Sequence, residues 1–259
     1  MKYYIVSDIH GFYDEMIDAL TEKGYFSDTE PHKLIICGDL LDRGNQVNEL
    51  CGFVIELLKR DEIILIKGNH EDLLIDLAEE IYKYLPNPQS TFHGTNGTFK
   101  TALALANMKP DEVEVYPKNF RNRVLNSVFV KKIVNSMVDY FETEHYIFVH
   151  GWIPCKEDYI RGRGSIYSYM KGWRSATEKV WAYARWLNGM AMQKHGVYER
   201  GKTIVCGHFH TSWGHSVIEG RCSEFGKNAD FSPYYNDGII AIDGCTSYTK
   251  RVNCIVIED

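Results

Sequence analysis

The sequence lacks the apolar segments of a membrane-anchored or secreted protein. Its longest uninterrupted apolar runs, 102–106 and 180–184, are five residues long, whereas a helix that spans a bilayer needs roughly 18 apolar residues. Near the N-terminus only residues 3–6 are consecutively apolar, and a secretory signal needs a stretch of about 7–15. We therefore expect a cytoplasmic protein with no membrane partner.

Paired cysteines and clusters of basic residues are missing as well. The seven cysteines are an odd number without any Cys-x-x-Cys pair, which argues against a disulfide framework and against a thiolate zinc site. The 29 basic and 35 acidic residues give a net charge of −6, and no run of lysine or arginine offers the basic surface that nucleic acid requires. The composition predicts a reduced globular protein without a nucleic-acid partner and leaves the oligomeric state open.

Strands and helices alternate in the first third of the chain. Short β-branched or aromatic runs are each followed by apolar residues at helical spacing, an order that predicts a partly parallel sheet with right-handed crossovers. The expected strands are 3–7, 34–37 and 63–66, and the expected helices are 12–23, 47–58 and 73–85. A length of 259 residues fits one large domain, 1–259, because single domains reach about 250 residues.

The alternation stops after this region. Residues 87–143 carry helical patterns at 99–106 and 128–141 with turn residues between them, and we interpret this segment as a mostly helical insertion. Beyond it we expect strands at 145–149, 203–206, 216–218, 239–242 and 253–257, and a helix at 175–188. The fold class that these patterns predict is α/β.

Polar side chains with metal-binding chemistry follow five of the expected strands. They are Asp8 and His10, Asp39, Asn69 and His70, His150, and His208 and His210. Ligands of open α/β sheets bind outside the carboxyl ends of the strands, so we expect these segments to converge on one crevice. Carboxylates and imidazoles together suit Mn, Fe, Co, Ni or Zn better than Mg or Ca. Taken alone, Asn69 also fits a turn residue with positive φ.

Five short motifs resemble, in order along the chain, those of the calcineurin-like metallophosphoesterases. They are Asp8-Ile9-His10-Gly11, Gly38-Asp39-x-x-Asp42-Arg43-Gly44, Gly68-Asn69-His70-Glu71, His150-Gly151 and Gly207-His208-x-His210. The Asp-Arg-Gly and Gly-Asn-His-Glu forms are most similar to the branch that holds Ser/Thr protein phosphatases and symmetrical diadenosine tetraphosphatases. The resemblance implies a four-layer sandwich of two mixed β-sheets flanked by helices, with the insertion as a helical lid over the metal end.

The resemblance also implies a role for each motif residue around two divalent metal ions. Manganese is the ion that we expect first, with Fe, Zn, Ni or Co as alternatives. The implied ligands are Asp8 and His10 for the first ion, Asp39 as a bridge, and Asn69, His150 and His208 for the second ion. The last motif departs from the protein-phosphatase pattern by its second histidine, His210, which we assign to the first ion.

The implied catalytic residues are His70, Asp42 and Arg43. By the resemblance, His70 is the proton donor, Asp42 orients it, and Arg43 holds phosphate oxygens. Without the motif, Asp42 and Arg43 also fit an exposed ion pair of little energetic weight. A second departure is Trp152, which follows Gly151 where that branch commonly has another glycine.

Two residues outside the motifs are candidates for substrate binding. Arg185 lies on an apolar helical stretch and needs an anion, because arginine is almost never buried unpaired. That anion is either a structural carboxylate or a substrate phosphate. Asn96 lies in Thr95-Asn96-Gly97-Thr98 near the start of an expected helix, where backbone N–H groups offer an anion site or an ordinary N-cap.

The resemblance therefore predicts a two-metal hydrolase of phosphate esters, and we expect a Ser/Thr-type phosphatase first. The alternative is a symmetrical diadenosine tetraphosphatase or another nucleotide pyrophosphohydrolase, so the partner is a phosphoprotein or a nucleotide polyphosphate. Basic residues of the insertion, Lys100, Lys118, Arg121 and Arg123, fit contacts to a polyphosphate and fit a solvated surface equally well. A non-catalytic scaffold is a third hypothesis, although scaffolds tend to lose motif residues and none is missing.

Overall fold

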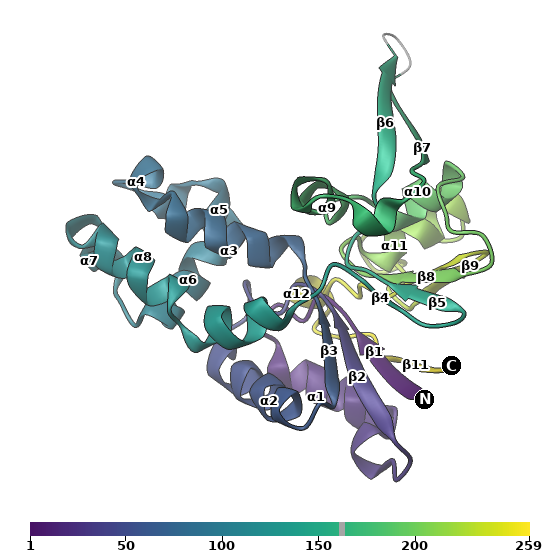
Figure 1. The fold of residues 1–259 in the computed structure, drawn as a ribbon, viewed down its shortest axis with the longest axis horizontal. Coiled ribbons are helices and arrows are strands. Elements are labelled where there is room, and N and C mark those ends of the chain that lie inside the picture. Colours follow the sequence, from purple (N-terminus) through teal and green to yellow (C-terminus); the bar gives the residue numbers. More distant parts are fainter. Residues whose placement is uncertain (161–163) are drawn as a thin grey trace.

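Two mixed β-sheets lie at the centre of the structure, a computed structural model that describes residues 1–160 and 164–259 (Figure 1). The first sheet has the order β11-β1-β2-β3, with strands Ile255–Glu258, Lys2–Val6, His32–Cys37 and Ile63–Ile66. The second sheet has the order β4-β5-β8-β10-β9, with strands Phe141–Glu142, Tyr146–Phe148, Thr203–Cys206, Ile239–Ala241 and Tyr234–Asn236. Three consecutive strands pair in parallel within each sheet, β1-β2-β3 in the first and β5-β8-β10 in the second.

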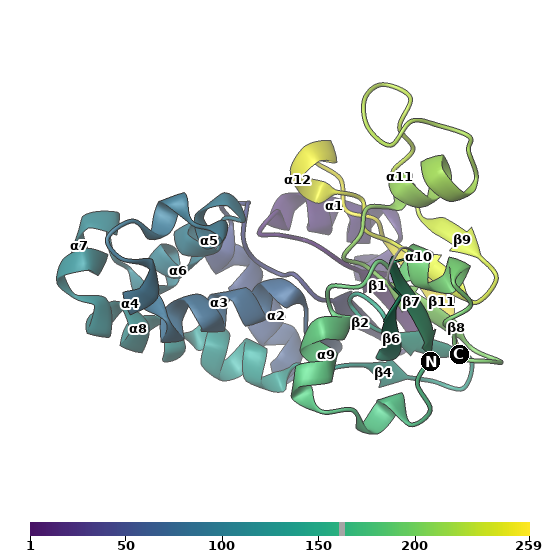
Figure 2. The same cartoon turned by 90° about the horizontal axis from the view of Figure 1, so that it is seen from above.

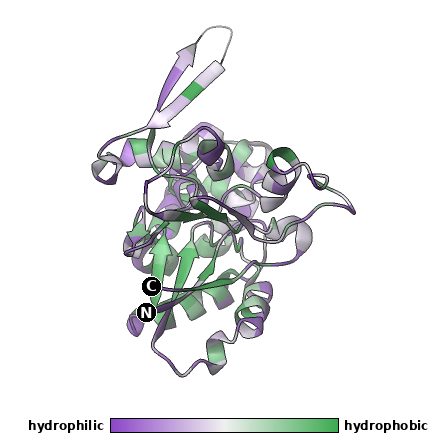
Figure 3. Ribbon diagram, turned by 90° about the vertical axis from the view of Figure 1, so that its right-hand side faces the viewer, coloured by the Kyte–Doolittle hydropathy of each residue, from purple (hydrophilic) through white to green (hydrophobic). Residues whose placement is uncertain are grey.

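The strands of the first sheet are apolar on both faces because both faces are covered. Tyr3 and Ile5 of β1 pack against residues of the second sheet, while Tyr4 and Val6 pack against helices. This alternation follows from the two-residue period of a strand, and it explains why these strands read as continuous apolar runs. Figure 3 shows the resulting apolar strands in the interior.

Helices cover the outer face of each sheet and complete four layers. On the first sheet lie α1 (Tyr13–Glu22) and α2 (Val47–Lys59), and on the second lie α9 (Glu178–Ala184) and α10 (Gly189–Lys194). Two short helices, α11 (Thr211–Trp213) and α12 (Thr246–Thr249), follow β8 and β10. The four-layer α/β sandwich that the family resemblance implies is confirmed.

A helical lobe extends from one end of the sandwich in both views (Figures 1 and 2). Its helices are α3 (Asn69–Glu79), α4 (Ile81–Tyr84), α5 (Phe92–Thr95), α6 (Thr98–Ala106), α7 (Pro110–Val115) and α8 (Pro117–Leu125). Leu77 of α3, Ala102 of α6 and Phe120 of α8 belong to the same apolar core as the helix-covered face of the first sheet. Because this core is continuous, the lobe is built onto α3, and the role of residues 87–143 as a lid stays a prediction.

The helix expected at 128–141 is only partly present. The chain makes a π-helical turn, Phe129–Ile133, and a 3-10 turn, Val134–Ser136, and leaves the helical conformation after Ser136. It then runs alongside β3, where the Val138 N–H donates to the Leu65 carbonyl and the Val138 carbonyl accepts from the Lys67 N–H, both at 2.9 Å. Pairing with the open edge of β3 therefore outweighs the local helical pattern.

Three further expectations differ from the structure at the second sheet. Residues 216–218 form part of a π-helical turn, Gly214–Ile218, and are not a strand. The helix expected at 175–188 is limited to α9. The antiparallel hairpin of β6 (Cys155–Ile160) and β7 (Gly164–Tyr169) was not expected, because it projects from the sandwich (Figure 1) and lacks the alternating burial that a sequence pattern records. Among the described residues, no helix has the length and apolarity to cross a bilayer.

Candidate metal centre

The residues of the five motifs meet at one end of the two sheets. The first sheet delivers Asp8, His10, Asp39, Asn69 and His70, and the second delivers His150, His208 and His210. They meet because β1, β2 and β3 run parallel and β5 and β8 run parallel, so each set of carboxyl ends lies at a common edge.

The backbone of these segments is strained. Positive φ angles of 51° to 75° occur at Asp8, His10, Asp39, Asp42, Arg43 and His208. A left-handed conformation costs an L-residue roughly 1–2 kcal/mol, and such residues persist only where their surroundings hold them. Here the first two loops are tied together, since Asp8 N–H donates to the Gly38 carbonyl at 3.2 Å and His10 N–H donates to the Asp39 carbonyl at 3.0 Å. Strain of this kind is typical of functional sites.

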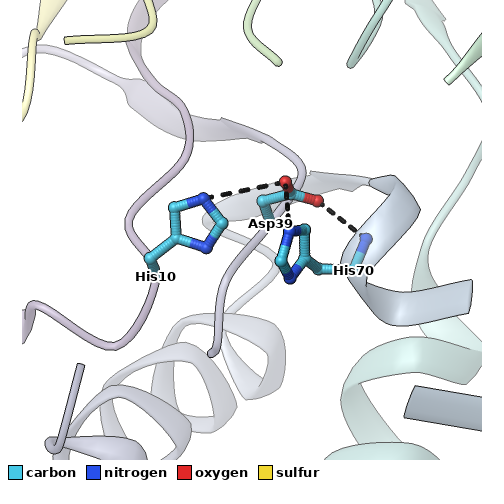
Figure 4. A group of neighbouring side chains, drawn as sticks. All are labelled: His10, Asp39 and His70. Carbon is cyan, nitrogen blue, oxygen red and sulfur yellow. Dashed lines mark hydrogen bonds and ion pairs between the residues drawn. The ribbon is translucent and has the colours of Figure 1, made fainter. Parts of the chain in front are cut away.

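Asp39 lies between two groups of imidazoles. Its Oδ2 is 3.8 Å from Nε2 of His10 and 3.8 Å from Nε2 of His70 (Figure 4), and its Oδ1 is 3.3 Å from Nε2 of His150. Two sets of ligand atoms each fit within 4.8 Å, one from His10, Asp39 and His70 and one from Asp39, His150 and His208. Asp39 is the member that both sets share, so its two oxygens can serve two cations.

Two imidazoles are oriented to present Nε2 to the centre. Nδ1 of His10 lies 3.0 Å from the Leu41 carbonyl and Nδ1 of His150 lies 2.8 Å from the Cys37 carbonyl, so each Nδ1–H donates there. In the neutral ring Nε2 is then an acceptor. Nε2 of His150 is 2.8 Å from Oδ1 of Asn69, another acceptor. Two acceptors at this distance need a cation or a proton between them, which fits a metal ligand pair.

Burial sets the charge of this centre. It lowers the pKa of His10 well below its usual value and that of His208 to about 3, so both rings are neutral as metal ligands require. Burial alone raises the pKa of Asp39, but the neighbouring imidazoles, first that of His150, hold it below its usual value. Asp39 is therefore ionised, and the site combines a buried carboxylate with imidazole nitrogen donors.

Asp243 is a site residue that sequence reasoning missed. It is buried and forms a group of carboxylates with Asp8 and Asp39. Burial raises the pKa of both Asp8 and Asp243, and the neighbouring carboxylates raise both pKa values further. Buried carboxylates this close to one another favour a bound cation. In the sequence Asp243 precedes Gly244, a pair that is typical of a turn. Its position directly after an expected strand could have indicated the site, because Asp243 follows β10, which runs parallel to β8 and ends at the same edge of the sheet.

His70 is fixed by the helical lobe. Its Nδ1 lies 2.6 Å from Oδ2 of Asp42, and the same oxygen accepts a hydrogen bond of 2.7 Å from Oγ1 of Thr98 at the start of α6. Asp42 N–H also donates to Oγ1 of Thr101 at 3.1 Å. Burial lowers the pKa of His70, but the carboxylates of Asp39 and Asp42 outweigh it and the net pKa is raised. The lobe thus supports the carboxylate that holds this imidazole.

Arg43 projects its guanidinium over the histidines of the first group. Nη1 is 2.8 Å from Nε2 of His10 and Nη2 is 3.3 Å from Nε2 of His70. Within the described part of the chain, no carboxylate lies within ion-pair distance of this guanidinium. Gly97, with a φ of +86°, lets the chain before α6 pack closely on Arg43, since a Cβ at this position would lie 2.5 Å from the backbone nitrogen of Arg43. A planar guanidinium in this position suits the oxygens of a phosphate.

Three predicted residues have partners of their own. Nε2 of His210 lies 2.9 Å from Oε1 of Glu224, and His210 is in neither ligand set. Nδ2 of Asn96 donates to the Phe92 carbonyl at 2.8 Å, while the N-cap of α6 is Gly97. Arg185 is 2% exposed and pairs with carboxylates, which is the structural alternative that the sequence left open. None of these contacts supports the roles in metal or substrate binding, which stay predictions.

Two imidazole–carboxylate groups that share one aspartate, at the end of a four-layer α/β sandwich, define a protein suited to hold two divalent cations. The sequence profile of the calcineurin-like phosphoesterases matches residues 1–232, so the chain belongs to this family, whose members use divalent metals in a binuclear centre. The family expected from the motifs is confirmed.

Relatives with assigned names match part of the chain. An asymmetrical bis(5′-nucleosyl)-tetraphosphatase PrpE of Bacillus velezensis is 36% identical over 123 residues, which cover 44% of this chain and 45% of that protein. A symmetrical bis(5′-nucleosyl)-tetraphosphatase of Buchnera aphidicola is 41% identical over 99 residues, or 35% of each. The chain thus spans less than half the length of these relatives.

Solved structures show a similar fold over the whole chain. A cold-active protein-tyrosine phosphatase of a Shewanella species is 18% identical, with a TM-score of 0.52 over 100% of this chain and 75% of the other. A second cold-active protein tyrosine phosphatase, 17% identical, has a TM-score of 0.55 over 99% of this chain and 73% of the other. At this identity the likeness shows the fold alone.

Proposed function

We propose that this protein hydrolyses phosphoric esters or anhydrides with the help of two divalent cations. The observation that carries the proposal is the position of Asp39, whose two carboxylate oxygens face different imidazole groups. A site that shares one carboxylate between two sets of ligands is typical of two-metal hydrolases. All five motifs are intact, which does not favour a non-catalytic scaffold.

The ligands of the two cations would come from different sheets. By the family motifs, Asp8, His10 and Asp39 would hold the first cation, and Asp39, Asn69, His150 and His208 would hold the second. Asp8 itself is in neither of the two ligand sets, and the first set contains His70 beside His10 and Asp39. Such cations stabilise charge on phosphoryl oxygens and make hydroxide available near neutral pH. Manganese is the first choice because the donors are nitrogen and carboxylate oxygen in a mixed set.

The protein's own groups would bind the phosphate and supply a proton. Arg43 would hold two phosphate oxygens, because its guanidinium lies over the centre without a carboxylate partner among the described residues. His70 would donate a proton from Nε2 to the leaving oxygen, since its Nδ1–H is committed to Asp42 and its pKa is raised by Asp39 and Asp42. Proton donation by a positioned group typically contributes about 10²–10⁴-fold.

For the substrate we propose a bis(5′-nucleosyl) polyphosphate. The sequence motifs put a Ser/Thr-type phosphatase first and a symmetrical diadenosine tetraphosphatase second. The relatives with assigned names reverse this order, because both the asymmetrical and the symmetrical bis(5′-nucleosyl)-tetraphosphatases match the chain. The similar solved structures named protein tyrosine phosphatases share the fold and do not bear on the substrate.

A panel of substrates tests the proposal. The manganese-loaded protein is assayed against diadenosine tetraphosphate, p-nitrophenyl phosphate, its bis-ester and a phosphoserine peptide, with Asp39→Asn as the inactive control. We expect the highest kcat/KM on diadenosine tetraphosphate. Separation of the products then distinguishes two ADP from AMP plus ATP. A higher kcat/KM on the phosphopeptide would replace the substrate proposal, and no hydrolysis of any of the four would overturn the phosphoesterase proposal.

A further inference from the structure

Exposed aromatic side chains gather in two places next to the candidate metal centre. Phe92 of α5 and Trp186, which follows α9, are 55% and 43% exposed, and their ring centroids are 6.2 Å apart. Phe225 and Tyr248 are 49% and 56% exposed, with centroids 5.7 Å apart. Single exposed aromatics are ordinary, but exposed aromatics in mutual contact mark binding surfaces. We call the first pair the lobe flank and the second the loop flank.

Both flanks contact histidines of the same short segment. The Trp186 ring lies 5.8 Å from that of His208 in an edge-to-face arrangement, and the Phe225 ring lies 4.9 Å from that of His210. These two histidines are two residues apart, so their Cα atoms are within about 7 Å of each other. His208 belongs to the ligand set around Asp39. The two flanks therefore border one centre on the sides of His208 and His210.

The loop flank is held in place before any ligand arrives. Ser212 Oγ donates to the Glu224 carbonyl at 2.7 Å, and Asn253 Nδ2 donates to the Phe231 carbonyl at 2.8 Å. The Phe231 ring packs against both members of the flank, at 6.2 Å from Phe225 and 5.7 Å from Tyr248. A surface fixed in this way loses little conformational freedom when it binds a planar group.

We propose that each flank stacks against one nucleobase of a bis(5′-nucleosyl) polyphosphate whose phosphate chain crosses the metal centre. This inference rests on the proposed function and adds where the two ends of the substrate bind. Two separate aromatic surfaces, each in contact with a histidine of one segment at the candidate metal centre, match a substrate that carries a base at each end of its phosphates. A phosphoserine peptide presents no second planar group at a fixed distance from its phosphate. Base stacking on aromatic side chains is tolerant of base identity.

The experiment measures binding without turnover. The manganese-loaded protein is titrated calorimetrically with a methylene-bridged diadenosine tetraphosphate and, separately, with inorganic tetraphosphate, which has no bases. The variants are Trp186→Leu for the lobe flank and Phe225→Leu for the loop flank. Trp186→Phe restores an aromatic ring. Phe26→Leu is the matched control because Phe26 is 53% exposed and its ring packs against those of Tyr25 and Phe53, which are not site residues.

We expect the wild-type protein to bind the dinucleotide at least about tenfold more tightly than tetraphosphate, and each leucine variant to reduce this ratio by about fivefold or more. Trp186→Phe and Phe26→Leu should keep the ratio. In turnover of diadenosine tetraphosphate the leucine variants should raise KM with little change in kcat, and KM for p-nitrophenyl phosphate should stay the same.

Equal affinity of the wild-type protein for the dinucleotide and for tetraphosphate would overturn the inference. So would leucine variants that weaken the binding of both ligands alike. The proposed function fails separately, if the wild-type protein hydrolyses neither p-nitrophenyl phosphate nor diadenosine tetraphosphate. The affinity ratio is measured without hydrolysis and is independent of that result.

Discussion

The two sheets hold their site residues in different ways. On the first sheet the loops are tied to one another, and the buried carboxylate of Glu71 accepts hydrogen bonds from the backbone N–H groups of Gly68, Asp39 and Leu40 at 2.8, 3.1 and 2.9 Å. On the second sheet His150 and His208 rely on the first. Nδ1 of His150 donates to Cys37 of β2, and His208 N–H donates to Asp8 at 2.9 Å.

This difference assigns unequal parts to the two halves of the site. The first sheet forms a preassembled frame that includes the bridging carboxylate, the proton donor and the phosphate-binding arginine. The second sheet adds ligands whose orientation depends on that frame. Changes in the first sheet should therefore affect both cations, and changes at the contacts between the halves should affect stability more than chemistry.

The largest effect is expected from Asp39→Asn. An amide has one oxygen to offer and no charge, so the variant should lose both cations. We expect the turnover of p-nitrophenyl phosphate to fall by more than about 10⁴-fold, beyond the 10²–10⁴-fold that one proton donor contributes. Metal analysis after manganese loading checks the cause. Asp61→Asn is the control, because Asp61 is exposed and pairs only with Lys33 among the described residues. A variant that keeps two manganese ions per chain would contradict the bridging role.

The next effect concerns His70→Asn. If His70 donates the proton, the variant keeps its cations while kcat falls by about 10²–10⁴-fold on a substrate with a poor leaving group. The loss should be much smaller on p-nitrophenyl phosphate, whose leaving group needs little protonation. Equal losses on both substrates, or a lower manganese content, would mean that His70 is a metal ligand, a role that its position near Asp39 also allows.

A smaller effect is expected where the helical lobe meets the frame. Thr98→Val removes the hydroxyl that donates to Asp42, and residues that support a catalytic group in this way typically contribute about 10–100-fold. We expect kcat on diadenosine tetraphosphate to fall by about tenfold with an unchanged melting temperature. Thr246→Val is the matched control, a buried threonine whose hydroxyl has no hydrogen-bond partner among the described residues. An unchanged kcat in Thr98→Val would show that Asp42 holds His70 without help from the Thr98 hydroxyl.

The site was predictable from the sequence where strand ends carry recognisable pairs of ligand residues. Asp8 and His10 after β1, and Asn69 and His70 after β3, are local patterns, and their strands were identifiable because both faces are buried. Asp243 was not predictable in this way, since one aspartate before a glycine after β10 reads as a turn. Its meaning comes from β10 pairing with β8, a contact between distant parts of the chain.

The fold was least predictable where tertiary contacts replace local preference. Residues 128–141 have an apolar pattern of helical spacing, yet Val138 pairs with the open edge of β3. The segment 95–98 was assigned to an N-cap or an anion site, whereas the Thr98 hydroxyl donates to Asp42, 56 positions away in the sequence. Both outcomes depend on contacts that no window of sequence contains.

The smallest effect on activity is expected from Arg185→Ala, which changes a contact between the two halves. The guanidinium joins Asp72 of α3 at 2.7 Å, Glu178 of α9 at 3.0 Å, and Asp139. Its carboxylate partners are 20%, 63% and 30% exposed, respectively. Because solvent screens them, we expect a loss of about 1–3 kcal/mol rather than the 3–5 kcal/mol of a fully buried pair. That loss lowers the melting temperature by roughly 3–10 °C in a chain of this size.

The same variant separates the two roles that the sequence left open for Arg185. If Arg185 is only a structural partner of carboxylates, Arg185→Ala should keep kcat/KM on p-nitrophenyl phosphate and inhibition by inorganic phosphate within about twofold of wild type. Arg185→Lys should then restore only part of the stability, because a single ammonium cannot reach three carboxylates as a planar guanidinium does. Arg174→Ala is the control, since Arg174 bonds Glu142 through two nitrogens at a more exposed position and should cost less than about 1 kcal/mol. A tenfold lower kcat/KM with weaker phosphate inhibition and an unchanged melting temperature would instead make Arg185 a substrate-binding residue, and the two halves of the site would then share the phosphate.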